Sequence, residues 1–383
     1  MQANESAGTP RASSRAPLSR SAFLRATAGA LITGGSLLGA QSAARAAGPG
    51  GSGSPRTGAG TVQVTKVGDL TGPGITTRFR MEATDLGIPA RSPDGRLLFV
   101  FGDTFEGASV GGGWWRSPVA LHGNTAHLGG TVTWTGAVGG EHAQQLWNYE
   151  HDNPVFSTVL PSDVITIGNT MYLHIMVNKG LGNVVWTEIW RSDDSGASWA
   201  HTGAKFPSDL HGGMFQLLTW GLGDDGYVYV YSTGFQRDKP IILHRVRSDR
   251  ITDLSAYQPW GWSGGVWSWG NPPTPVLEGK FGELCLRPLD GKWILTWFNA
   301  ADYRIDGIIM DNPTSNLYTA PRETLIWGGA WGSEDDSHVA QLYGGYIIPG
   351  SKLDDLHLSV SQWNTEAGWP YRVMQFRVQA FGG

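Results

Sequence analysis

The chain has 383 residues, 40% hydrophobic and only 16% charged, which is enough for one large domain or two ordinary ones. Its 55 glycines and 18 tryptophans are typical of many short strands joined by tight turns, and long helical runs are not visible. Residues 1–46 carry five arginines and one glutamate, so the remainder of a chain with net charge −5 is near −9. An acidic body without basic stripes argues against nucleic-acid and anionic-membrane partners.

The first 46 residues are predicted to be an export signal. A basic region up to Arg25 precedes the apolar stretch 26–40, and Ala44-Arg45-Ala46 offers a small-x-small cleavage site. Segment 19–25 resembles a twin-arginine signal in which Ser21 replaces the second arginine. We expect a Gly/Ser/Pro-rich linker at 47–62 and one catalytic domain at 63–383, secreted or held in the cell envelope without a stable membrane span. The alternative is an uncleaved anchor, although the apolar stretch is short and broken by glycines.

From Thr61 onward, a loose theme of strand, tight turn, aromatic strand and loop recurs five times. Period-2 alternation predicts a strand at the centre of each copy, at 97–101, 171–175, 227–231, 293–297 and 356–360. Four centres follow a pair typical of two-residue hairpins: Asp94-Gly95, Gly168-Asn169, Asp225-Gly226 and Asp290-Gly291. Units of about sixty residues predict an all-β, five-bladed β-propeller, with a β-sandwich as the alternative.

The innermost strand of each propeller blade lines the central channel, so polar residues where it begins converge on one axis. The expected openings are 84–87, 162–165, 213–216, 282–285 and 337–340. Three of them carry a carboxylate, at Asp85, Asp163 and Glu283, and Asp103 is a fourth acid nearby. Glycosidic-bond cleavage needs one carboxylic acid and one carboxylate with separated pKa values. These four acids are the predicted catalytic residues, although each alone could be a turn former.

Other side chains are expected to contact a sugar. Tryptophans in Gly-rich loops, at 114–115 and 260–269, could stack on sugar faces or wedge between blades. The predicted substrate-binding residues are Trp115, Arg116, His211, Gln216, Asn299 and His338. Segment 192–199 matches the Asp-box turn, a structural motif that resembles the blade hairpins of sialidases and favours a propeller.

The sequence predicts no cofactor and no metal site. Cys285 is the only cysteine, and the histidines lack paired ligand spacing such as His-x-x-x-His. The serine-nucleophile pattern at 107–111 would need a strand-to-helix elbow, and no helix is predicted after it. An acyl hydrolase is therefore disfavoured, and the oligomeric state stays open.

Several motifs resemble glycoside hydrolase family 183, the endo-D-arabinanases of actinobacteria. They are Thr84-Asp85-Leu86-Gly87-Ile88-Pro89, Phe101-Gly102-Asp103-Thr104-Phe105, Gly282-Glu283-Leu284, and the segments 343–349 and 359–364, and the similarity spans roughly residues 64–378. The resemblance implies a five-bladed propeller that cuts internal α-D-arabinofuranosyl linkages in the arabinan of mycobacterial-type arabinogalactan and lipoarabinomannan. It maps the family's paired aspartates onto Asp85 and Asp103, with Glu283 opposite them.

This resemblance leads to an assignment of roles. Asp85 or Asp103 is expected to be the general base or nucleophile, Glu283 the general acid and Asp163 an orienting residue. The expected partner is a D-arabinan polysaccharide and not a nucleic acid. The alternative function is a non-catalytic propeller that binds envelope polysaccharide through its tryptophan loops, which predicts binding that survives loss of Asp85 and Asp103.

Overall fold

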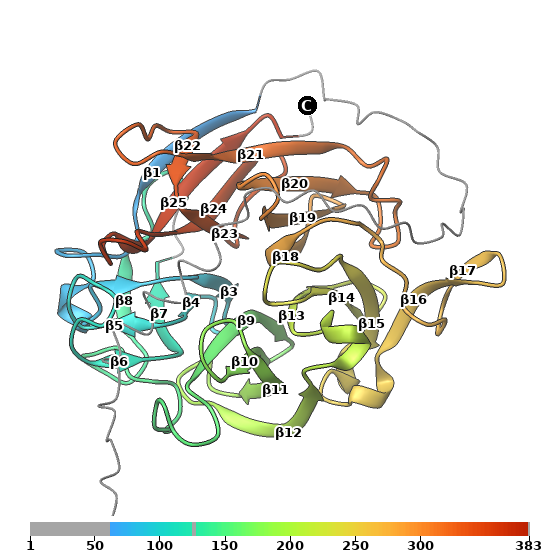
Figure 1. Cartoon of the computed structure of the whole chain (residues 1–383), viewed down its shortest axis with the longest axis horizontal. Helices are drawn as coiled ribbons and strands as arrows, with labels where there is room; N and C mark the ends of the chain where they lie inside the picture. Colours follow the sequence, from blue (N-terminus) through green and yellow to red (C-terminus); the bar gives the residue numbers. More distant parts are fainter. Residues whose placement is uncertain (1–61, 125–127, 382–383) are drawn as a thin grey trace, which may run out of the picture.

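The computed structural model describes residues 62–124 and 128–381, and its regular structure consists almost entirely of β-strands (Figure 1). Short 3₁₀ segments occur between some strands: η1 (Thr77–Phe79), η2 (Leu210–Gly213), η3 (Ser248–Arg250) and η4 (Leu254–Ala256). Within the described residues, no helix is long and apolar enough to cross a membrane.

Five sheets stand around a central axis, which confirms the predicted five-bladed β-propeller (Figure 1). Blade 1 contains β3 (Ile88–Arg91), β4 (Leu97–Phe101), β7 (Val119–Gly123) and β8 (Trp134–Ala137). Blade 2 contains β9 (Thr158–Ile167), β10 (Thr170–Asn178), β11 (Val184–Ser192) and β12 (Ala200–Pro207). Blade 3 contains β13 (Leu217–Leu222), β14 (Tyr227–Thr233), β15 (Ile242–Arg247), β16 (Gln258–Ser263) and β17 (Val266–Trp269). Blade 4 contains β18 (Phe281–Leu289), β19 (Lys292–Asn299), β20 (Arg304–Met310), β21 (Arg322–Gly329) and β22 (His338–Ala340). Blade 5 contains β23 (Leu342–Ile347), β24 (Asp355–Trp363), β25 (Tyr371–Gln379) and β1 (Gln63–Asp69).

The five predicted strand centres are the second strands of the blades, β4, β10, β14, β19 and β24. In β4, Leu98 and Val100 pack into one apolar cluster, whereas Leu97, Phe99 and Phe101 pack into another. Both faces of the strand are therefore buried, since successive side chains point to opposite faces and each face meets a different neighbour. The tight turns that precede these strands lie at one end of the propeller. The innermost strands consequently begin at the opposite end.

Polar side chains join neighbouring blades around the axis. Ser162 in β9 accepts from the Leu218 N–H of β13 at 2.8 Å, and Thr219 in β13 accepts from the Leu286 N–H of β18 at 2.8 Å. Thr296 in β19 donates to the Gly345 carbonyl of β23 at 2.6 Å. Because buried backbone groups need partners, these bonds fix the blades relative to one another.

The two ends of the described chain meet in blade 5. Strand β1 pairs antiparallel with β25, from Gln63 opposite Gln379 to Asp69 opposite Met374. The N-terminal strand is thus the outermost strand of the C-terminal blade, as Figure 1 shows. Cys285 is buried and free, so hydrogen bonds and packing, without any disulfide, hold this closure.

A small extra sheet lies beside blade 1 and contains β2 (Ala83–Thr84), β5 (Thr104–Phe105) and β6 (Trp115–Arg116). Thr84 pairs with Thr104, and their hydroxyl oxygens are 2.7 Å apart. Asp85 follows β2 directly and Asp103 precedes β5 directly. This pairing brings two acids 18 positions apart in sequence to the same end of the propeller.

Candidate active site

A cavity of about 480 Å³ opens at the end of the channel where the innermost strands begin. Residues from every blade line it, including Leu86 before β3, Leu160 in β9, Leu217 in β13, Glu283 in β18 and Leu342 in β23. Asp85 and Asp103 also line this cavity. Three of the four predicted catalytic acids therefore share one space.

Asp85 is the acid whose environment disfavours charge most. Its Oδ2 accepts a hydrogen bond from the Tyr343 hydroxyl at 2.9 Å, whereas its Oδ1 is shielded from solvent and has no partner among the described residues. Burial raises the pKa of Asp85 to about 8, the charges of Asp103 and Glu283 add to the rise, and nearby Tyr371 and Tyr343 oppose it. At neutral pH this carboxyl group holds a proton.

The backbone gives Asp85 very little space. A methyl group added at Gly102 would overlap Oδ1 of Asp85 and would lie 3.0 Å from Cδ1 of Leu86. The Gly102 N–H donates to the Asp85 carbonyl at 3.2 Å. Glycine at 102 therefore sets the position of the Asp85 carboxyl group, a constraint that the residue type alone does not reveal.

Asp103 is held by two donors. Its Oδ1 accepts from Nε1 of Trp115 at 2.8 Å and from the Thr158 hydroxyl at 3.0 Å. Burial raises the pKa of Asp103 to about 6, while the Trp115 and Thr158 hydrogen bonds lower it and the Asp152 charge raises it. Asp103 is therefore ionised at neutral pH while Asp85 is not. Pairs of acids whose pKa values differ in this way are suited to acid and base roles.

Glu283 is 3% exposed and forms an ion pair inside the same cavity. A terminal nitrogen of Arg237 donates to Oε1 of Glu283 at 2.6 Å, and the guanidinium lies 4.8 Å from the Phe298 ring centre. Oε2 of Glu283 is shielded and has no partner among the described residues. The ion pair with Arg237 holds the Glu283 carboxyl group at the wall of the cavity.

Asp163 does not lie in the cavity, contrary to the prediction. It sits in the middle of the ten-residue strand β9, with its side chain fully buried. Arg287 donates to both of its oxygens, at 2.8 and 3.1 Å, and Thr219 and the Trp220 N–H donate to Oδ2 at 2.7 and 2.8 Å. Asp163 thus connects blades 2, 3 and 4 as part of the structure. The prediction missed this because β9 begins four residues earlier than the sequence suggested.

The predicted substrate-binding residues do not line the cavity, although Trp115 reaches it through its bond to Asp103. Arg116 is buried and donates to the carbonyls of Ala143 and Arg80, and its guanidinium lies 4.1 Å from the Trp114 ring centre. His211 lies against His244, with their Nε2 atoms 3.1 Å apart. Both residues therefore have structural partners.

The other three predicted residues are also engaged elsewhere. Gln216 donates to the Ser208 carbonyl and accepts from the Phe235 N–H, so it supports a loop of the cavity wall. Asn299 donates to Asp306 at 2.8 Å. His338 lies in β22, which pairs parallel with β21 at the outer edge of blade 4, and contacts Asp335 at 3.0 Å. The innermost strand of blade 5 begins only at Leu342, so the expected opening at 337–340 was wrong.

Sequence reasoning missed Arg237, Tyr343 and Tyr371, all of which line the cavity. Tyr343 lies within a motif that carries the family resemblance, so a signal for it was present. Arg237 lies in the β14–β15 loop and Tyr371 begins β25, and neither has a local pattern that indicates a site.

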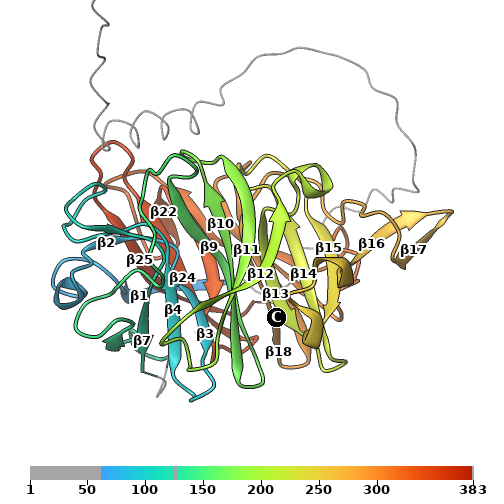
Figure 2. The same cartoon turned by 90° about the horizontal axis from the view of Figure 1, so that it is seen from below.

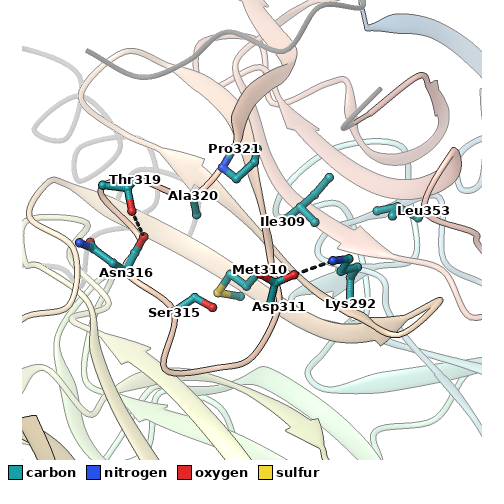
Figure 3. Close-up of a pocket in the computed structure, with 10 residues that line it drawn as sticks. All are labelled: Lys292, Ile309, Met310, Asp311, Ser315, Asn316, Thr319, Ala320, Pro321 and Leu353. Carbon is teal, nitrogen blue, oxygen red and sulfur yellow. Dashed lines mark hydrogen bonds and ion pairs between the residues drawn. The ribbon is translucent and has the colours of Figure 1, made fainter. Parts of the chain in front are cut away.

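A second pocket of about 410 Å³ lies at the opposite end of the propeller, next to blade 4. Figure 3 shows Lys292 directed at Asp311. Nζ of Lys292 lies 2.5 Å from Oδ1 of Asp311. Apart from this exposed ion pair, its lining consists of neutral side chains, such as Asn316, Ser315 and Leu353. This pocket lacks the coupled, buried carboxyl groups of the channel cavity. Within residues 62–124 and 128–381, no group of three or more His, Cys, Asp or Glu is arranged to hold a metal ion.

Fold and cavity together define a five-bladed β-propeller with an acid-lined pocket at one end of its channel. Residues 71–377 match the family described as a domain of unknown function, DUF4185, and the chain belongs to this family.

Proteins similar to this chain have been found in bacteria and fungi. One is a 35.9 kDa Mycolicibacterium smegmatis protein described as uncharacterized, 32% identical over 333 residues that cover 82% of this chain and 97% of that protein. Another is notoamide biosynthesis cluster protein J' of Aspergillus versicolor, 32% identical over 323 residues that cover 75% of this chain and 83% of that protein. Among solved structures, a Bacteroides ovatus protein described as a candidate hydrolase has a TM-score of 0.59 at 14% identity, covering 84% of this chain and 91% of that one. This last likeness concerns the fold.

Proposed function

We propose that this protein is a glycoside hydrolase that cleaves internal α-D-arabinofuranosyl linkages of cell-wall D-arabinan. The observation that carries the proposal is the pairing of a protonated Asp85 with an ionised Asp103 in one open cavity. Hydrolysis of a glycosidic bond requires a carboxylic acid to protonate the leaving oxygen and a carboxylate on the other side of the bond.

In this proposal Asp85 is the general acid. Its pKa of about 8 keeps the proton available at neutral pH, and Tyr343 holds the carboxyl group in place. Asp103 takes the role of the general base or nucleophile, because its pKa of about 6 leaves it ionised and Trp115 and Thr158 fix one of its oxygens. The assignment of Asp103 agrees with the expectation drawn from the sequence.

Glu283 receives a different role from the one expected. Arg237 donates to Oε1 of Glu283 at 2.6 Å, and Asp85 already takes the role of general acid in this proposal. We assign Glu283 to substrate positioning, because it lines the cavity together with Asp85 and Asp103.

The choice of D-arabinan rests on the motif resemblance around Asp85, Asp103 and Glu283. A cavity that is open at the end of the channel is compatible with a polymer whose two ends extend beyond it. Export by the N-terminal segment, which lies outside the described residues, is part of the same proposal, because a cell-wall polymer is met only outside the membrane.

The test is chromatography of the products after incubation of the purified chain with mycobacterial arabinogalactan. We expect D-arabinose oligosaccharides from the wild type and none from Asp85→Asn or Asp103→Asn. Asp311→Asn is the matched control, since Asp311 is 79% exposed and lies at the opposite end. Binding of the polymer by all four proteins without any products would instead support the non-catalytic propeller.

A further inference from the structure

The most prominent exposed aromatic feature lies outside the cavity, on hairpin β16–β17 of blade 3. The two strands pair Trp260 with Trp269 and Trp262 with Trp267. Directly opposed residues, and residues two apart on one strand, share a face of an antiparallel ribbon, so all four indole rings lie on one face. We call these four residues the tryptophan face. Figures 1 and 2 show the hairpin projecting from the side of the propeller.

The inner half of the tryptophan face is anchored. The Trp269 ring centre lies 6.0 Å from that of Tyr229, and the Arg245 guanidinium lies 4.4 Å from the Trp269 ring centre. At the outer half, Trp262 is 44% and Trp267 is 37% exposed. The hairpin therefore presents two large rings to solvent on a fixed base.

The rest of the hairpin holds these rings rigid. The Trp260 and Trp267 rings stack with centres 6.0 Å apart and planes 18° from parallel. Behind the ribbon, a methyl group at Gly261 would overlap the Pro272 carbonyl, and Asn271 donates to the Gly261 carbonyl at 3.0 Å. A surface whose rotamers are fixed in advance loses little conformational entropy when a ligand binds.

The chain leads from the hairpin to the cavity wall. Strand β13 begins at the cavity end and successive strands of blade 3 alternate in direction, so β16 runs back toward that end before the hairpin projects sideways from the propeller (Figure 2). After the hairpin the chain pairs Leu277 with Ile241 and then reaches Lys280, which lines the cavity. The neighbouring β14–β15 loop supplies Arg237 to the cavity wall.

We propose that the tryptophan face is a second glycan-binding site, which holds a remote part of a polysaccharide chain whose nearer part occupies the cavity. The choice of glycan rests on the proposed function. Segment 258–271 contains no charged residue, which fits a neutral ligand, and flat indole faces suit the apolar faces of sugar rings. A ligand that also enters a cavity lined by three carboxyl groups has to be hydrophilic, which favours a glycan over a lipid surface.

The test uses the full chain carrying Asp103→Asn, so that binding is measured without hydrolysis. In this background, the double variant Trp262→Ala/Trp267→Ala should bind arabinogalactan at least about tenfold more weakly. A tenfold loss of affinity corresponds to the loss of one or two aromatic contacts. Trp327→Ala is the matched control, since Trp327 is also 44% exposed but lies on blade 4. Trp262→Ala alone, at the exposed tip, should give part of the loss if the double variant folds poorly.

The same substitutions in the active chain separate the two proposals. Cleavage of a short arabino-oligosaccharide should be unchanged, while cleavage of the polymer slows. Tryptophan-dependent binding without any cleavage would contradict the proposed hydrolase activity and still support the glycan-binding site. Unchanged polymer affinity in the tryptophan variants, or binding to phosphatidylcholine vesicles in place of the polymer, would overturn the glycan site.

Discussion

Arg287 in blade 4 donates to both carboxylate oxygens of Asp163 in blade 2, and Asp163 also accepts from two groups of blade 3. The pair is buried on the Asp163 side and 16% exposed on the Arg287 side. Removal of one partner leaves the other charge buried without compensation.

Asp163→Ala is therefore expected to destabilise the protein by about 3–5 kcal/mol, because the largely buried Arg287 would lose its carboxylate partner and keep only the Trp220 and Leu286 carbonyls as acceptors. Denaturant unfolding followed by tryptophan fluorescence measures this. Turnover per folded molecule should stay within a few-fold of the wild type. Normal stability together with lost turnover would return Asp163 to the catalytic residues.

Asp85→Asn should lower kcat/KM by about 10²–10⁴-fold, the usual contribution of a positioned proton donor.

The same substitution tests the origin of the raised pKa of Asp85. The unfolded chain releases this proton near pH 4, whereas the folded chain keeps it to about 8. The stabilising contribution of the proton is therefore complete at low pH and is lost as the pH rises toward 8.

It follows that the free energy of unfolding of Asp85→Asn, relative to the wild type, should increase from about pH 5 to about pH 8, because the variant has no proton to lose. Chemical unfolding of both proteins across this range measures the difference. A constant difference would mean that Asp85 titrates in the folded chain as it does in the unfolded one.

The pH profile of kcat/KM should be bell-shaped and highest between about 6 and about 8, where Asp103 is ionised and Asp85 is protonated. Initial rates on a short arabino-oligosaccharide provide the profile. An acidic limb well below 6 would exclude Asp103 as the base. An alkaline limb that persists in Asp85→Asn would exclude Asp85 as the acid.

Gly102→Ala should reduce activity by an order of magnitude or more, because the added methyl group overlaps Oδ1 of Asp85 and displaces the carboxyl group that we propose as the proton donor. Gly136→Ala is the matched control, since a methyl group at Gly136 meets nothing within 4 Å. Measuring kcat/KM and the melting temperature of both variants shows whether a loss of activity comes from the displacement of Asp85 or from lower stability of the fold. Equal activity in both variants would contradict the tight placement of Asp85.

Local chemistry was enough to predict the framework of the fold. The Asp-Gly and Gly-Asn pairs before four of the second strands, and the period-2 alternation in all five, placed the second strand of every blade, because turn geometry and strand period are short-range properties. Asp85 was predicted from the expected opening of an inner strand, and the family resemblance singled out both Asp85 and Asp103, which line the cavity.

The parts of the site that were missed depend on register and on long-range contact. Asp163 faces Arg287 across 124 positions, and whether an acid lies at the start or the middle of a strand depends on where pairing with its neighbour begins. Arg237 reaches Glu283 across 46 positions. No local pattern of residue types encodes either contact.

The pairing of β1 with β25 has a consequence for how the protein is made. The first described strand finds its partner about 310 positions later, so the ring cannot close until nearly the whole chain has been synthesised. Contacts of such sequence separation form slowly. During synthesis, β1 therefore has no partner strand, and the ring of blades stays incomplete until β25 has been made.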